Sequence, residues 1–254
     1  MLYIIVVSHF HEKYIARLLG NISVDRLENV KIIIKDNVKS PELKKICASY
    51  GVEYLSSEKK MGFGENNNYA VKNIMHKYTL KKEDYIFFIN PDVIVSCEVI
   101  QDLYTYVIER NIQLFTIDLY KDFEMNIRDC SVRQFPNLKD FVSSYLFKKN
   151  STIIQRDSIT SPTVVDWCAG SFIGISSGLF KQLKGFDEKY YMYCEDIDLC
   201  FRAKKNGSQL VYLPYFKAIH STHFSNRKFM SKHFIWHIKS IVRFLLKKNN
   251  IIGN

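Results

Sequence analysis

The chain has 254 residues, of which 47% are hydrophobic and 24% charged, and its formal net charge is +10. This length suits one large domain, or one domain with an appendage, and the composition excludes disordered and fibrous proteins. No run approaches the roughly 18 apolar residues that span a bilayer. The six cysteines form no C-x-x-C pair, which favours free thiols over a disulfide or zinc framework.

Positive charge is concentrated at the C-terminal end. Eleven of the 36 basic residues follow Asp198, and no acidic residue does. On a helical wheel, apolar side chains of the last stretch gather on one arc, formed by Phe234, Ile235, Ile238, Ile241, Val242, Leu245 and Leu246. Basic side chains gather on the other arc, formed by Lys232, His233, His237, Lys239, Arg243, Lys247 and Lys248, with Trp236 and Phe244 among them. We therefore expect residues 226–254 to be a basic amphipathic tail on an anionic membrane surface.

Two alternatives exist for this tail. A terminal helix could dock on the domain through its apolar arc and leave a solvated basic face. A nucleic-acid-binding face would also be basic, but no recognised module accompanies it, so we expect no nucleic-acid partner. The apolar N-terminus lacks the basic segment and cleavage site of a signal peptide, and we expect a peripheral protein without a transmembrane helix.

Strand-like and helix-like segments alternate along the first half of the chain. The sequence predicts strands at residues 2–8, 30–35, 52–55, 85–89 and 113–117, and helices at 12–21, 41–50, 68–78 and 98–110. Such alternation is typical of an α/β protein with a mostly parallel, Rossmann-like sheet flanked by helices. Residues 118–163 lose this periodicity, and we expect irregular structure with short helices there. A strand at 164–175, helices at 176–183 and 196–206, and a short strand at 209–213 follow.

Carboxylates stand at the ends of two predicted strands. Asp36 ends the second strand, and Asp92 follows the apolar run of residues 85–89, which Pro91 interrupts. The carboxyl ends of parallel strands form the edge at which open α/β sheets bind ligands. Because aspartate is also a favoured helix N-cap, a capping role is the alternative for Asp92.

A second group of polar residues occurs late in the chain. Glu195, Asp196 and Asp198 lie at the start of a predicted helix, and His220 follows the last strand. The helix dipole favours carboxylates there, which explains one acid more readily than three. An ionised carboxylate suits a general base for a hydroxyl nucleophile, whereas an aspartate with a histidine suits Mn²⁺ or Mg²⁺. A lone histidine is more often structural.

Taken together, the motifs resemble those of the family 2 glycosyltransferases of the GT-A fold over almost the whole chain. The resemblance rests on IIVVSHFHEKYI, KDN, GFGENNNYAV, NPDV, WCAGSF and GFDEKYYMYCEDIDLCFRAKKNG, in this order. More narrowly, TVVDWCAGSF, YMYCEDIDLC and AIHSTHFSNRKFMSKHFIWHIKS resemble the bacterial O-antigen rhamnosyltransferases. The resemblance implies a GT-A domain at residues 1–225, with a nucleotide-sugar-binding half at 1–117 and an acceptor-binding half at 118–225.

The resemblance also implies a role for each motif. Asp36 would accept the N3–H of the donor base, with Ser8 and His9 lining the base pocket. Gly62, Gly64 and Asn66 would let the backbone approach the ribose and diphosphate, although an ordinary glycine turn is the alternative. Asp92 and His220 would ligate the Mn²⁺ or Mg²⁺ that bridges the diphosphate. Asn90 stands where the family often has an aspartate, and a neutral amide is a poorer cation ligand. Asp196 would deprotonate the acceptor hydroxyl, with Glu195 as second choice, and Trp167 and Gly170 would shape the acceptor subsite.

The activity implied is that of an inverting glycosyltransferase in O-antigen synthesis. It would move L-rhamnose from dTDP-β-L-rhamnose to an N-acetylglucosamine linked to a polyprenyl diphosphate. Such an enzyme would act peripherally at the cytoplasmic face of the inner membrane. Another transferred sugar, such as glucose or galactofuranose, is an alternative, and so is a catalytically silent nucleotide-binding scaffold of the same fold.

Overall fold

The computed structural model describes residues 1–146, 151–221 and 232–253. One sheet is built from β1 (Leu2–Ser8), β2 (Val30–Asp36), β3 (Glu53–Ser56), β4 (Tyr85–Ile89), β5 (Val93–Ile94), β6 (Leu114–Tyr120), β8 (Thr163–Val165), β10 (Phe172–Ser176) and β11 (Leu210–His220), and a two-stranded sheet pairs β7 (Val132–Arg133) with β9 (Trp167–Cys168). The helices are α1 (Glu12–Ile22), α2 (Pro41–Ser49), α3 (Phe63–Lys77), α4 (Cys97–Glu109), α5 (Leu138–Leu146), α6 (Ser177–Gln182), α7 (Glu195–Lys205) and α8 (Lys232–Lys248), with a 3₁₀ turn at Val24–Arg26.

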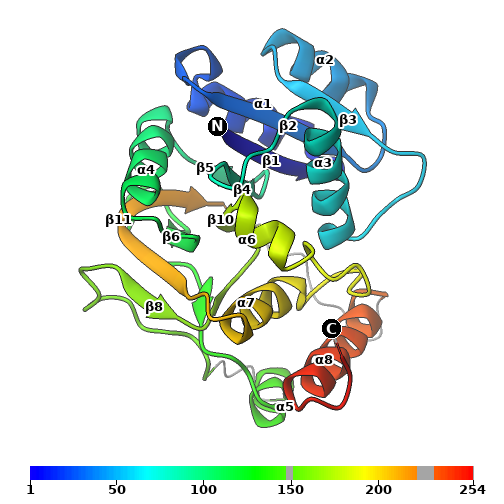
Figure 1. The fold of residues 1–254 in the computed structure, drawn as a ribbon, viewed down its shortest axis with the longest axis vertical. Coiled ribbons are helices and arrows are strands. Elements are labelled where there is room, and N and C mark those ends of the chain that lie inside the picture. Colours follow the sequence, from blue (N-terminus) through cyan, green and yellow to red (C-terminus); the bar gives the residue numbers. More distant parts are fainter. Residues whose placement is uncertain (147–150, 222–231, 254) are drawn as a thin grey trace.

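The large sheet is mixed, in the order β3-β2-β1-β4-β10-β6-β11-β5, with β8 added to β11 (Figure 1). Strands β1 to β4 pair in parallel, as the βαβ alternation predicts. The second half differs from the predicted mostly parallel arrangement, because β10 runs antiparallel to both β4 and β6. The chain reaches β10 from the irregular region before it, and an antiparallel strand needs no helical crossover.

Strand β4 lies in the middle of the sheet and is buried on both faces, as predicted. Tyr85, Phe87 and Ile89 face the core beneath α1, α2 and α4, whereas Ile86 and Phe88 face the core that includes α3, α6 and α7. This alternation follows from the two-residue period of a strand. Burial on both sides explains the uninterrupted apolar run.

Three predicted boundaries are wrong. Helix α3 begins at Phe63 and not at residue 68, because Gly62 takes the N-cap position in extended backbone. The strand predicted at 164–175 is divided into β8, β9 and β10. Strand β11 continues through Pro214 to His220, with a shift in register between Leu213 and Lys217. A proline is tolerated at such an irregularity, where the ladder needs no N–H.

Helix α8 docks on the domain, which is the alternative noted for the tail. Its Ile241 and Phe244 side chains are buried in the core. The solvated basic face expected with such docking is wrong for Arg243 and Lys247, since both pair with Asp187 and the Lys247 side chain is only 2% exposed. No helix in the described ranges is long and apolar enough to cross a membrane. Residues 226–231 of the predicted tail, and its boundary at 225, lie outside the described residues.

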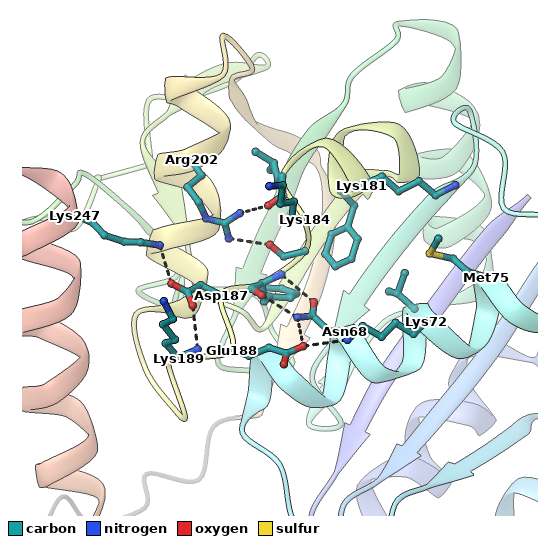
Figure 2. A pocket seen from close by; sticks show the side chains of 15 residues that line it. Asn68, Lys72, Met75, Lys181, Lys184, Asp187, Glu188, Lys189, Arg202 and Lys247 are labelled. Carbon is teal, nitrogen blue, oxygen red and sulfur yellow. Dashed lines mark hydrogen bonds and ion pairs between the residues drawn. The ribbon is translucent and has the colours of Figure 1, made fainter. Parts of the chain in front are cut away.

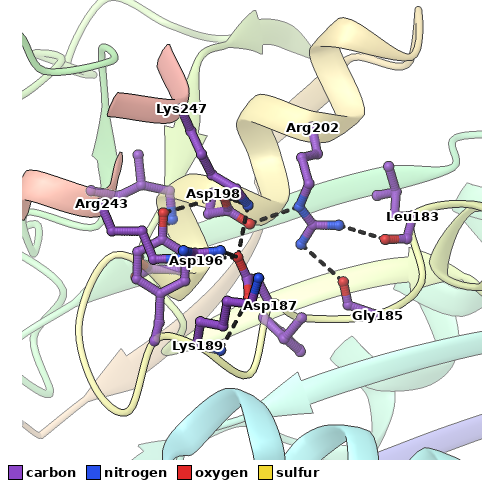
Figure 3. Close-up of polar contacts among 12 residues, drawn as sticks. Leu183, Gly185, Asp187, Lys189, Asp196, Asp198, Arg202, Arg243 and Lys247 are labelled. Atoms are coloured by element: carbon purple, nitrogen blue, oxygen red, sulfur yellow. Dashed lines mark hydrogen bonds and ion pairs between the residues drawn. The ribbon is translucent and has the colours of Figure 1, made fainter. Parts of the chain in front are cut away.

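A buried ion cluster joins α8 to α7 (Figure 3). Lys247 donates to Asp187 at 2.8 Å and to Asp198 at 2.7 Å, and Arg202 donates to Asp198 at 2.7 Å. Arg202 also donates to the carbonyls of Leu183 and Gly185. Asp198, fully buried here, therefore serves structure.

The pKa of Asp187 sets one expected pH dependence of stability. Burial disfavours the charged carboxylate, but hydrogen bonds from Lys247 and Arg243 outweigh it and lower the pKa from 3.8 to about 2. A depressed carboxyl pKa adds stability above pH 3.8, and this contribution is lost as the pH falls toward 2. It amounts to about 2 kcal/mol. Denaturant titrations at pH 7 and pH 2 should show that the stability difference between the wild type and Asp187→Asn shrinks by this amount, and a difference independent of pH contradicts the assignment.

Candidate active site

The carboxyl ends of β1 and β2 lie side by side, with Ser8 opposite Asp36 in the register. Asp36 is fully buried. Its carboxylate accepts hydrogen bonds from the N–H groups of Val38 (2.9 Å) and Ser40 (2.6 Å) and from the hydroxyl of Tyr54 (2.9 Å). In this structure Asp36 therefore holds the loop at residues 37–40, and its contact with a donor base stays a prediction.

The two other predicted base-pocket residues differ in accessibility. Ser8 is fully buried, and its hydroxyl accepts a hydrogen bond from the His11 N–H. His9 is exposed next to the buried Asn37 side chain, with 3.4 Å between the two polar groups. His9 is therefore accessible to a ligand, whereas Ser8 is not.

Gly62, Gly64 and Asn66 are placed differently from the prediction. All three are buried, and the Asn66 amide donates to the carbonyls of Met61 and Gly62. A Cβ atom at Gly62 would overlap the Tyr191 carbonyl, and one at Gly64 would lie 2.9 Å from Phe186 Cβ. The glycines at 62 and 64 therefore permit the close approach of Tyr191 and Phe186, and their contact with a donor stays a prediction.

Gly62→Ala should strongly destabilise the fold for this reason. The added methyl meets backbone atoms of Tyr191, which cannot rotate away as a side chain can, and overpacking of this kind costs about 1–3 kcal/mol. Gly20→Ala is the matched control, because its Cβ meets only the Tyr50 hydroxyl at 3.5 Å and alanine is favoured inside a helix. Thermal denaturation should show a lower Tm for the first variant and an equal or higher Tm for the second; equal losses contradict this account.

Asp92 and His220 are brought together by the pairing of β11 with β5, in which His220 lies opposite Val93. The His220 Nε2 atom lies 3.4 Å from Asp92 Oδ1, and its Nδ1 atom lies 3.0 Å from Asp129 Oδ2. Burial disfavours the imidazolium, but hydrogen bonds and charge from Asp129 and Asp92 outweigh it and raise the pKa of His220 to about 9.

Asp129 is a site residue that sequence reasoning missed. It is buried, and Arg156 forms an ion pair with its Oδ1 atom, whereas His220 contacts its Oδ2 atom. A carboxylate that accepts from one imidazole nitrogen orients the ring and leaves the other nitrogen for a metal. Asp129 lies in the aperiodic region 118–163, where no sequence pattern distinguishes it.

The pair Asp92 and His220 fits a Mn²⁺ or Mg²⁺ ion in the chemistry of its donors. One carboxylate oxygen and one imidazole nitrogen converge within 3.4 Å, and Mn²⁺ accepts both ligand types. Among the described residues, no group of three or more histidine, cysteine or acidic side chains could hold a metal. Further ligands would therefore have to come from a bound substrate or from water.

The acids of the 195–198 segment connect to this edge through the turn at Gly170 and Ser171. The Asn90 N–H donates to the Ser171 carbonyl (2.9 Å), and the Gly170 N–H donates to Asp196 Oδ2 (3.0 Å). This turn therefore links the backbone that follows β4 to the Asp196 carboxylate. Gly170 is partly exposed, and a Cβ there would press on the Phe63 ring at 3.0 Å.

The carboxylates of the 195–198 segment have different surroundings. Asp196 is partly exposed and also accepts from the Ile197 N–H at 2.8 Å, whereas Glu195 is buried with no hydrogen-bond partner for Oε2 in the described structure. Burial, and then the charge of Asp196, raise the pKa of Glu195 well above its usual range. Burial also raises the pKa of Asp196, against the hydrogen bonds from the backbone and the positive charge of Arg133. Asp196 is therefore the better placed of the two to be ionised and reached by a substrate.

Trp167 is not placed to form the wall of a subsite. Its ring is 6% exposed within the core, and its Nε1–H donates to the Gln134 carbonyl. The Arg133 guanidinium lies over this ring, 5.4 Å from its centroid. Trp167 therefore supports Arg133, which sequence reasoning did not single out and which contributes positive charge near Asp196.

A cavity of about 680 Å³ lies elsewhere, between α3, the loop after α6, and α7 (Figure 2). Its lining includes Val71, Met75, Phe180 and several lysines. Neither Asp92 nor Asp196 lines it. The cavity is therefore separate from the candidate active site.

Comparison with solved structures defines the class of the fold. The structure of GalNAc-T7 with UDP, GalNAc and Mn²⁺ aligns with a TM-score of 0.67 and 13% identity, over 97% of this chain and 47% of that one. This likeness concerns the fold alone and identifies it as GT-A-like. Asp36 and Asp92 lie at the edge of the sheet in this fold.

Sequence comparison then gives the family. The family model Glycosyl transferase family 2 matches residues 3–178. Rhamnosyltransferase WbbL of Escherichia coli K12 is 47% identical over 255 residues, which cover all of this chain and 96% of that protein. The N-acetylglucosaminyl-diphospho-decaprenol L-rhamnosyltransferase of Mycobacterium tuberculosis is 36% identical over 86 residues, or 34% of this chain and 28% of that protein. The chain therefore belongs to glycosyl transferase family 2 and is a glycosyltransferase.

Proposed function

We propose that the chain transfers L-rhamnose from dTDP-β-L-rhamnose to N-acetylglucosamine linked to a polyprenyl diphosphate, with inversion at the anomeric carbon. The observation that carries this proposal is the partly exposed Asp196 carboxylate, which the turn at Gly170 and Ser171 links by hydrogen bonds to Asn90, two residues before Asp92. The full-length similarity to a rhamnosyltransferase supports the sugar. The shorter similarity to an enzyme named for a decaprenyl diphosphate acceptor supports the acceptor class.

The residues of the site divide the work of a single displacement. Asp196 takes the proton of the acceptor hydroxyl as its oxygen attacks the anomeric carbon. Asp92 and His220 would hold a divalent cation, which would supply positive charge to offset the charge on the leaving diphosphate. Asp129 holds the His220 ring through Nδ1 and keeps Nε2 directed to the cation site.

A transfer assay tests the proposal. The purified protein is given a synthetic lipid-diphospho-N-acetylglucosamine and a panel of donors: dTDP-rhamnose, UDP-glucose and UDP-galactofuranose, each with EDTA, Mn²⁺ or Mg²⁺. Rhamnose transfer that requires the added cation is expected. Transfer of glucose or galactofuranose alone would reassign the donor, and binding of a donor without any transfer would indicate a nucleotide-binding scaffold.

We also propose that α8 holds the enzyme at the cytoplasmic surface of the inner membrane, where a polyprenyl-linked acceptor is available. The docked helix directs a row of apolar side chains outward: Ile235, Ile238 and Val242 are 50%, 38% and 50% exposed. Exposed Lys232 and Lys239 flank this row. An outward apolar row beside lysines suits the interface of an anionic bilayer.

Vesicle binding should depend on this outward row. We expect Ile238→Asp to reduce co-sedimentation with anionic phospholipid vesicles by about tenfold, because a carboxylate opposes both the apolar contact and the anionic surface. Ile108→Asp changes a similarly exposed isoleucine at the end of α4 and should bind as the wild type does. Equal binding by all three proteins would remove α8 from the membrane contact.

A further inference from the structure

The turn before α7 determines the direction of the catalytic carboxylate. Tyr193 and Cys194, which immediately precede Glu195, have φ angles of 72° and 65°. Two successive non-glycine residues in the left-handed region are uncommon and persist only where the surroundings hold them. Whatever holds this turn therefore also sets where α7 begins and where Asp196 points.

Contacts from two helices, α3 and α8, hold the turn. At the start of α3, the Phe63 N–H donates to the Tyr191 carbonyl at 3.1 Å. On α8, the Ser240 hydroxyl donates to the Met192 carbonyl at 2.9 Å, and the Trp236 and Tyr191 rings lie 4.6 Å apart. A further contact comes from the first turn of α8, where His233 hydrogen-bonds to the Tyr193 hydroxyl at 3.2 Å.

The same face of α8 is anchored to α7 beyond the turn. Ser240 and Lys247 are seven residues apart, so they lie on one side of the helix, with buried Phe244 between them. Lys247 donates to Asp198, which follows Asp196 by two residues (Figure 3). Helix α8 thus contacts the chain both before and after Asp196, and none of these contacts is with Asp196 itself.

We propose that α8 is the positioning element of the catalytic turn, with Ser240 and Lys247 as positioning residues that fix the direction of Asp196. This inference rests on the proposed role of Asp196 as general base. Helix α8 then has two faces with separate tasks. The outward face contacts the membrane, and the inward face holds the turn that carries the base.

Ser240→Ala is the direct test, because it removes one hydrogen bond to the turn and leaves the ion cluster intact. We expect kcat to fall about fivefold, the rate equivalent of one net hydrogen bond, with KM for the donor unchanged. Amide hydrogen exchange in a peptide covering residues 190–197 should become faster. Ser240→Thr keeps a hydroxyl and should restore both values. Ser49→Ala is the control, since that hydroxyl also donates to a backbone carbonyl, that of Ile46, but on the distant α2.

Hydrogen exchange makes the result independent of the assigned substrates. Unchanged exchange at 190–197 in Ser240→Ala overturns the proposal, as does faster exchange with an unchanged kcat while Asp196→Asn is inactive. Full activity of Asp196→Asn overturns the proposed base instead, and exchange still reports whether α8 holds the turn. Lys247→Met tests the ion pairs of α8 by the same two measurements, kcat and hydrogen exchange at 190–197. If that variant does not fold, the result for Ser240→Ala decides the proposal.

Discussion

Asp196→Asn should lower kcat for sugar transfer by about 10²- to 10⁴-fold, the usual contribution of a positioned general base. The amide keeps the shape of the side chain, but it has one oxygen where Asp196 uses one for the Gly170 N–H and the other for the Ile197 N–H, and it cannot take a proton. The proposed donor contacts lie at the ends of β1, β2 and β4, so donor affinity should be unchanged. Single-turnover kinetics together with calorimetric titration of the donor would measure both quantities.

Glu195→Gln separates the two carboxylates that compete for the role of base. Glu195 is buried beside Asp196 and its pKa is raised, first by burial and then by that charge. A neutral glutamine therefore reproduces the charge that Glu195 has when protonated, and we expect activity within about tenfold of the wild type. A loss as large as that of Asp196→Asn would move the base role to Glu195.

Asp198→Asn should be the most destabilising of the substitutions considered. It removes the negative charge that Arg202 and Lys247 share, and Asp198 is fully buried with both partners at 2.7 Å. Breaking a buried ion pair from one side leaves uncompensated charge and costs about 3–5 kcal/mol. Chemical denaturation should report this loss as a lower midpoint with an unchanged slope.

Lys204→Ala is the control for that experiment. Lys204 lies on the same helix and pairs with Asp166 at 2.8 Å, but its side chain is 63% exposed. Exposed pairs contribute about 0–1 kcal/mol. Similar losses for the two variants would show that burial of the Asp198 cluster is not what stabilises α7 and α8.

Local sequence patterns predicted most of the first half of the fold. The run Tyr85–Ile89 matches β4, and the helices predicted at 12–21 and 41–50 match α1 and α2 within a residue or two. These elements have strong periodicity, and turn residues mark their ends. The mixed second half was not predicted, because β10 and β11 pair with strands more than 80 residues earlier, and no local pattern records such partners.

The acids of the site were predicted better than their surroundings. Asp92 and His220 are neighbours as the resemblance implied, and Asp196 is the partly exposed acid of its segment. Their roles in catalysis and metal binding stay predictions. Gly62 and Gly64 were predicted to allow the close approach of a ligand, and in the structure they accommodate Tyr191 and Phe186. A glycine motif indicates that another group approaches the backbone closely, but it does not identify that group.

The sequence by itself determined the βαβ half of the sheet, the order of the acidic motifs along the chain and the amphipathic character of the last helix. The tertiary structure decided which face of that helix is used: Ser240, Phe244 and Lys247 face the domain, and Ile235, Ile238 and Val242 face outward. It also supplied Asp129 as the partner of His220, 91 residues away along the chain. Periodicity and end signals act over a few residues and can be read locally, whereas the partner of a buried charge or a strained turn is set by the packing of distant segments.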